Sequence, residues 1–191
     1  MLRVQHGDLR AFEELVEKYK QAVVNLISRM LGDPVEAEDL GQNVFVQVYR
    51  SAGRYRVSAK FSTWLFTIAR NLCLNELRRR SRHPADSLDA PHPEAEHEPQ
   101  HPVADRGQPG PVETLLEGEL AAKIQEALLD LPENQRLAIL LWRDDELAYE
   151  EIATVLGCSL TAIKSLIHRG RETLKRRLKP YLRTGIWSSE P

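Results

Sequence analysis

Residues 149–178 read YEEIATVLGCSLTAIKSLIHRGRETLKRRL, and this stretch decides the fold of the C-terminal part of the chain. The pattern predicts a short helix over 149–156, a turn at Gly157 that uses the left-handed backbone open to glycine, and a second helix. Ser159 is placed to cap that second helix, which is expected to run to about Leu178. Two helices joined by such a turn are typical of a helix-turn-helix, whose DNA-binding form places the second helix in the major groove.

The second helix has an apolar side and a polar side. Ile163 and Ile167 face inward at helical spacing. Hydroxyl, imidazole and cationic groups on the other side suit phosphates and base edges, and the free N–H groups at the helix start suit a phosphate. The candidate DNA-binding residues are Ser159, Thr161, Ala162, Lys164, Ser165, His168, Arg169 and Arg171. A charged hairpin that binds no DNA is the alternative, and His168 alone could be a solvated surface residue. The cations of 175–179 either solubilise the helix end or add nonspecific attraction to phosphates.

Two more helices precede this motif, over 113–130 and from Pro132 onward, each with leucines at helical spacing. The composition changes before them, because seven of the eleven prolines lie between Pro84 and Pro111, among many acids and almost no large apolar residues. Such a segment cannot bury enough surface to offset the entropy of ordering it. We therefore expect 84–112 to be a flexible linker, with an ordered surface loop as the alternative.

Three helices are predicted before the linker. Asp8 is placed to cap the first, Asp33 followed by Pro34 the second, and Ser62, after a loop over about 51–60, the third. The third helix ends in Arg78, Arg79 and Arg80, cations that suit the negative end of a helix. No segment alternates with period two, so the expected fold class is all-α: two small helical domains joined by a flexible linker.

The charge distribution is more informative than the formal net charge of −2. Residues 1–83 carry 14 Lys/Arg against 9 Asp/Glu, and residues 160–183 carry 8 against 1. The segment 84–159 between them is strongly acidic. Two basic blocks separated by acidic stretches indicate two surfaces that bind polyanions.

Several classes of protein are disfavoured. Cys73 and Cys158 stand far apart, outside any Cys/His cluster, so neither a disulfide framework nor a metal site is expected and a reducing cytoplasm fits. No apolar run is long enough for a membrane span, and no export signal is seen at the N-terminus. No nucleophile motif or phosphate loop indicates an enzyme, a cofactor or a small-molecule substrate. Glu13 with Glu17, and the acids of 144–146, are expected to be solvated.

Three segments together resemble one family. EAEDLGQNVFVQVYR (36–50) resembles the core-polymerase-binding segment of bacterial sigma factors, and GRYRVSAKFSTWLFTIARNLCLNELRRR (53–80) resembles their segment for −10 recognition and promoter melting. LPENQRLAILLWRDDELAYEEIATVLGCSLTAIKSLIHRGRETLKRRL (131–178) resembles their domain for −35 recognition. Their order and spacing resemble the extracytoplasmic-function group, over about 8–82 and 113–180. The implied domains are 1–83 (region 2), 84–112 (linker), 113–183 (region 4) and 184–191 (tail).

The resemblance assigns the residues of the first segment to a protein interface. Docking on the clamp coiled coil of core RNA polymerase is implied for Asp39, Leu40, Gln42, Asn43 and Gln47. An acidic, amide-bearing strip suits a basic partner. Phe45 is read as a core residue, and Leu40 could be one. The polymerase flap, promoter DNA and an anti-sigma factor are the other partners that the resemblance implies.

The second segment mixes aromatic residues with cations, which suits an unpaired strand: cations follow the backbone while flat side chains and pockets receive unstacked bases. The implied contacts to the −10 element are Tyr55, Arg56, Lys60, Phe61, Ser62, Trp64, Arg70, Asn71, Asn75, Arg78 and Arg79. Trp64 could equally be a core aromatic residue, and Asn71 could satisfy a buried backbone group. In the third segment, Ala148, Ala162 and Leu166 depart from the residues usual in the family, and Ala148 leaves its helix without a side-chain cap.

The expected function is therefore that of a non-enzymatic sigma factor, which directs core polymerase to promoters and helps to open them. The alternative is a stand-alone helix-turn-helix regulator, which would bind an operator without polymerase. The −10 and −35 elements lie about 85 Å apart on B-DNA. A relaxed linker of this length spans only about 30 Å, so polymerase is expected to set the spacing.

Overall fold

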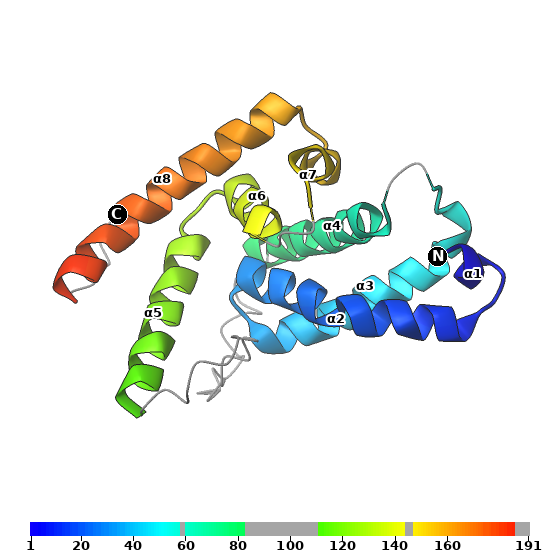
Figure 1. Ribbon diagram of the computed structural model, residues 1–191, viewed down its shortest axis with the longest axis horizontal. Coiled ribbons are helices and arrows are strands. Elements are labelled where there is room, and N and C mark those ends of the chain that lie inside the picture. Colours follow the sequence, from blue (N-terminus) through cyan, green and yellow to red (C-terminus); the bar gives the residue numbers. More distant parts are fainter. Residues whose placement is uncertain (58–59, 83–110, 144–146, 186–191) are drawn as a thin grey trace.

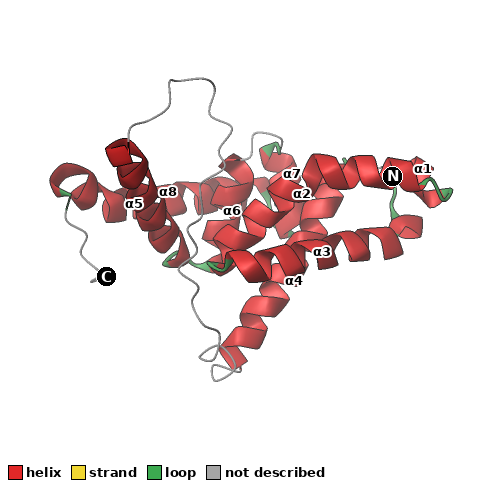
Figure 2. Ribbon diagram, turned by 90° about the horizontal axis from the view of Figure 1, so that it is seen from below, coloured by secondary structure: helices red, strands yellow, loops and turns green. Residues whose placement is uncertain are grey.

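The computed structural model describes residues 1–57, 60–82, 111–143 and 147–185, and every element in these ranges is a helix, which confirms the all-α prediction (Figures 1 and 2). The N-terminal elements are α1 (Leu2–Gln5), α2 (Leu9–Leu31), α3 (Pro34–Arg50), the 3-10 helix η1 (Ala52–Arg54) and α4 (Phe61–Arg82). The C-terminal elements are α5 (Pro111–Leu129), α6 (Glu133–Arg143), α7 (Tyr149–Leu156) and α8 (Leu160–Thr184). Most of the expected linker lies outside the described residues, and α5 already begins at Pro111.

The capping residues explain where α2 and α3 begin. The Asp8 carboxylate accepts the Ala11 N–H at 3.0 Å, and the Asp33 carboxylate accepts the Glu36 N–H at 3.0 Å, with Pro34 in the first turn. Both predicted caps are confirmed. The prediction for Ser62 is wrong, because α4 begins at Phe61 and Ser62 lies buried inside the helix.

The helix-turn-helix is confirmed. Gly157 ends α7 in the left-handed conformation with φ 65°, and the Ser159 hydroxyl caps α8 by accepting the Ala162 N–H at 3.2 Å. The predicted end of the last helix near Leu178 is wrong, because α8 continues through Pro180 to Thr184. Proline removes only one backbone donor, and the Arg177 guanidinium bonds to the Asp130 carboxylate at 2.8 Å, which fixes this part of α8 to the end of α5.

The N-terminal and C-terminal helices pack against each other, an arrangement that the sequence did not define. In Figure 1, α7 lies over α4, while α5 and α6 approach the end of α2. One continuous apolar cluster contains buried residues of both halves. Polar contacts cross the same boundary, for example the Gln125 amide donating to the Arg29 carbonyl at 3.2 Å.

Candidate nucleic-acid and protein interfaces

The outer face of α8 presents polar side chains to solvent. Ile163 and Ile167 are buried on the inner face, as the helical spacing predicts. The exposed members of the predicted set are Ser159, Thr161, Lys164, Ser165, His168, Arg169 and Arg171, and Ala162 is half-buried. Two hydroxyls are partly engaged, since Ser159 caps the helix and Ser165 donates to the Thr161 carbonyl at 3.0 Å. The remaining cations and the imidazole form a face that can contact phosphates and base edges.

The position of this face is fixed by close contact between α8 and α6. Gly170 lies against Ile139 so tightly that an added Cβ would be 2.4 Å from the isoleucine Cδ1. The Arg171 guanidinium carbon lies 5.0 Å from the centroid of the Trp142 ring, a cation–π contact that orients the arginine. Neither contact could be predicted from the sequence, because each joins residues about thirty positions apart.

The start of α4 carries an aromatic cluster. The Tyr55 ring centroid lies 5.3 Å from that of Trp64 and 6.3 Å from that of Phe61, whose ring also meets Tyr19 at 5.3 Å. Tyr55 is only 8% exposed and Ser62 only 6%, while Phe61 and Trp64 are half-buried. The structure therefore places Tyr55 within the cluster, against Phe61 and Trp64, and buries Ser62 in the first turn of α4.

Farther along α4, and in the loop before it, polar side chains point to solvent. Arg56, Asn71, Asn75, Arg78 and Arg79 are exposed, and Arg70 is half-buried with no partner for its Nε among the described residues. Arg78 donates to the Asn75 amide oxygen at 3.3 Å.

Two of the arginines at the end of α4 serve the fold. Arg79 pairs with Glu76 at 2.8 Å and with Glu36 at 3.5 Å. Arg80, for which the sequence pattern indicated no partner, pairs with Glu36 and donates to the Leu31 carbonyl at 3.2 Å. These bonds fasten the basic end of α4 to the start of α3.

Glu151 of α7 reaches across to α4, a contact that sequence reasoning missed. Its carboxylate lies 3.2 Å from the Lys60 ammonium, accepts the Thr63 hydroxyl at 3.4 Å and accepts the Ala148 N–H at 2.9 Å. Burial alone would raise the pKa of Glu151, but these three donors together lower it below its usual value. Ala148 supplies no side-chain cap, as predicted, and Glu151 satisfies its backbone N–H instead.

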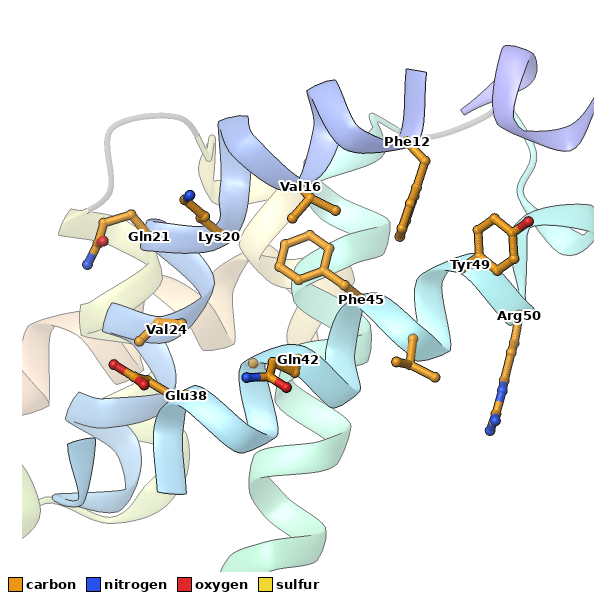
Figure 3. A pocket seen from close by; sticks show the side chains of 12 residues that line it. Phe12, Val16, Lys20, Gln21, Val24, Glu38, Gln42, Phe45, Tyr49 and Arg50 are labelled. Carbon is orange, nitrogen blue, oxygen red and sulfur yellow. The ribbon is translucent and has the colours of Figure 1, made fainter. Parts of the chain in front are cut away.

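A groove of about 680 Å³ runs between α2 and α3 (Figure 3). Its apolar walls are Phe12, Val16, Val24, Phe45, Val46 and Tyr49, and its polar rim is Lys20, Gln21, Glu38, Gln42 and Arg50. Gly41 lets α2 and α3 come close together along the groove, because a Cβ there would come within 2.9 Å of the Val24 Cγ2.

Residues predicted to bind a protein line this groove or flank it. Gln42 lies on its polar rim, and Asp39, Asn43 and Gln47 are exposed on the same helix. Leu40 is half-buried and packs on the core. Phe45, read as a core residue, is 8% exposed but also reaches the groove. Apolar walls with a mixed polar rim suit an amphipathic helix from a partner.

Two titratable groups are buried where the halves meet. Burial raises the pKa of the Cys73 thiol to about 12. Arg136 is only 5% exposed, its Nε has no hydrogen-bond partner among the described residues, and burial lowers the pKa of its guanidinium. In the ranges that the structure describes, no group of acidic, histidine or cysteine side chains is arranged to hold a metal, and no helix is long and apolar enough to cross a membrane.

Comparison with known proteins matches both halves of the chain. The family model for sigma-70 region 2 matches residues 15–83, and the model for sigma-70 region 4 matches residues 121–174. The RNA polymerase sigma-H factor of Pseudomonas aeruginosa is 40% identical over 182 residues, which cover 95% of this chain and 93% of the relative. The ECF RNA polymerase sigma factor SigW of Bacillus subtilis is 35% identical over 177 residues, covering 93% and 94%. The ECF RNA polymerase sigma-E factor of Escherichia coli is 35% identical over 181 residues, covering 95% and 93%.

Solved structures share the fold at 24% sequence identity. The sigma factor RpoE of Bartonella quintana, in complex with the anti-sigma factor NepR, has a TM-score of 0.66 and covers 89% of this chain and 98% of its own. CnrH, in complex with the cytosolic domain of CnrY, has a TM-score of 0.66 with 94% of each chain covered. Since both halves match sigma-70 regions and the relatives are similar along nearly the whole chain, this protein belongs to the extracytoplasmic-function RNA polymerase sigma factors, which direct transcription to particular promoters.

Proposed function

We propose that this sigma factor binds core polymerase through α3 and the α2–α3 groove, captures the −10 element along α4, and reads the −35 element with the outer face of α8. In this proposal residues 1–83 are region 2, 84–112 the linker, 113–183 region 4 and 184–191 the tail. The observation that carries it is the separation of three exposed surfaces on one chain: an apolar groove with a polar rim, and two helices with exposed cations. Sigma factors are not known as a family of enzymes, and we assign this chain no catalytic role and a cytoplasmic location.

The −10 surface is proposed to use the half-buried rings of Phe61 and Trp64 with the cations around them. Lys60 and Arg56 would follow the backbone, and Asn71 and Asn75 lie one turn apart on the exposed side of α4. Tyr55 and Ser62 would act from within, by holding the rings in place.

Transcription in vitro tests the whole proposal. A mixture of the purified chain, core polymerase and genomic DNA fragments should initiate transcription at defined start sites. If adding the chain produces no such start sites, the proposed function is refuted. The variant D39A/Q42A/N43A should bind core polymerase less tightly, whereas E13A, an exposed acid on α2, is the matched control. A stand-alone regulator would instead bind duplex DNA tightly without polymerase.

The linker is proposed to be held extended by polymerase, since its relaxed span is too short for the two promoter elements. Deleting half of residues 84–112 should impair transcription while core binding by the chain is retained. Unchanged promoter activity would contradict this role.

We also propose an anti-sigma partner whose helix occupies the α2–α3 groove. Support comes from the groove itself and from the similar solved structures, which contain a sigma factor with an anti-sigma factor or with a cytosolic protein domain. A captured protein supports this only if it prevents core binding and if V46D, a charge placed in the groove wall, abolishes its capture.

A further inference from the structure

We propose that the last turns of α8 form an additional site for the DNA backbone beside the −35 element. This α8 ridge consists of Lys175, Arg176, Lys179 and Arg183. The region 4 model ends at residue 174, whereas α8 runs to Thr184, so the ridge belongs to a helical extension beyond the residues that this family model matches. The inference rests on the proposed −35 role of α8.

The ridge continues the same side of the helix that carries the recognition residues. An α-helix turns by about 100° per residue, so positions separated by four or seven residues lie on one line. Lys164, His168, Lys175 and Lys179 are spaced by four, seven and four residues, and all four are exposed. The recognition face and the ridge therefore form one surface along a single helix.

The charge of the ridge is not neutralised among the described residues. Lys175 approaches Glu172 only at 3.9 Å between two exposed side chains, and no ion pair joins Arg176, Lys179 or Arg183 to a described residue. A surface pair of that length contributes little. Four cations within three turns of helix therefore face solvent together, which favours a polyanion.

The opposite side of the extension is anchored, so the ridge has a defined orientation. Arg177 is only 19% exposed in its side chain, and its guanidinium donates twice to the Asp130 carboxylate, at 3.0 and 2.8 Å. Leu174 packs against the apolar cluster. Cations that merely solubilise a helix end require no such anchoring.

The reach of the ridge fits the border of the major groove. At a rise of about 1.5 Å per residue, Lys175 lies about 16 Å and Lys179 about 22 Å along the axis from Lys164. The major groove is about 12 Å wide, so side chains at these distances lie over the phosphates at its edge when the first turns of α8 are inside it. Such contacts add affinity and fix orientation without reading sequence.

The test uses the full chain assembled with core polymerase on a promoter fragment, with affinity measured at several salt concentrations. K175Q/K179Q removes two ridge charges, and R10Q/K18Q removes two charges from exposed positions of α2 as the matched control. Each lost phosphate contact makes the negative slope of log K against log salt shallower by about 0.9. The affinity advantage of the original chain over K175Q/K179Q should therefore shrink about tenfold between 50 and 200 mM salt.

Three results would overturn the ridge: an unchanged slope, an equal change in R10Q/K18Q, or weaker binding of K175Q/K179Q to core polymerase without DNA. Discrimination between intact and altered −35 sequences should stay unchanged in K175Q/K179Q. K164A tests the recognition face separately from the ridge, because this variant should lose the discrimination between −35 sequences even if the ridge does not bind DNA. If K164A discriminates normally, the proposed reading of the −35 element by Lys164 is wrong, whereas the ridge is still decided by the salt slope of K175Q/K179Q.

Discussion

The packing of α8 against α6 requires that Gly170 has no side chain. It lies between two proposed DNA contacts, and an alanine Cβ there would stand 2.4 Å from Cδ1 and 3.2 Å from Cγ1 of Ile139. Ile139 is 7% exposed, so its side chain has little free space to enter. G170A should therefore destabilise the protein, although alanine is normally the better helix former.

The magnitude follows from two opposing effects. Replacing glycine by alanine within a helix gains about 1 kcal/mol, and overpacking a buried contact costs about 1–3 kcal/mol. The net loss in the free energy of unfolding should be about 1 kcal/mol. I139V removes the Cδ1 and by itself costs about 0.5–1.5 kcal/mol. In the I139V background G170A should become neutral or stabilising, which gives a coupling energy of about 1–2 kcal/mol.

Urea unfolding of the four proteins in the cycle measures this coupling. Gly118 provides the control, because nothing lies within 4 Å of a Cβ added there in the middle of α5, and G118A should stabilise the protein. If G170A and I139V were additive within about 0.5 kcal/mol, the close contact would not limit the position of α8.

Three further predictions concern other parts of the fold. Cys158 should react with a thiol reagent at pH 8 in the native protein. Cys73 has a pKa of about 12 and no exposed surface, so it should react only in denaturant, and two fast-reacting thiols in the native protein would contradict this. D33A should lower the free energy of unfolding by about 1 kcal/mol through loss of the α3 cap, and D33N should largely retain it. Because folding lowers the pKa of Glu151, its carboxylate contributes to the free energy of unfolding at neutral pH, and this contribution is lost as pH falls below 4.5. The free energy of unfolding of E151Q should therefore fall less between neutral and acid pH than that of the original protein.

Most of the helices and several of their ends could be predicted from the sequence because their causes are local. The Asp8 and Asp33 caps, the left-handed Gly157 and the inward isoleucines of α8 all follow from residues within one or two turns. α1 was missed because four residues carry no periodic signal. It is held from a distance, by the Gln5 amide donating to the Ala52 carbonyl at 2.7 Å and to that of Tyr55 at 3.0 Å.

The candidate surfaces could be predicted from the sequence only in part, because only local causes can be read from it. Exposure of the recognition residues follows from helical spacing, but burial of Tyr55 and Arg136 depends on elements far away in sequence. An arginine is expected at the surface unless paired, so nothing in the local pattern indicated a buried Arg136. The contact of Lys60 with Glu151, 91 positions along the chain, likewise follows only from the packing of the two halves.

The contact between α4 and α7 has a consequence for how this protein finds a promoter. Lys60 lies 3.2 Å from Glu151, and α8 is about 37 Å long. Every part of α8 therefore stays much closer to α4 than the roughly 85 Å that separates the two promoter elements. With the −10 and −35 surfaces as proposed above, only molecules in which α4 and α7 have parted can bind both elements at once. The apparent affinity for a complete promoter is thus scaled by the fraction of parted molecules, and whatever raises that fraction acts as an activator without touching DNA.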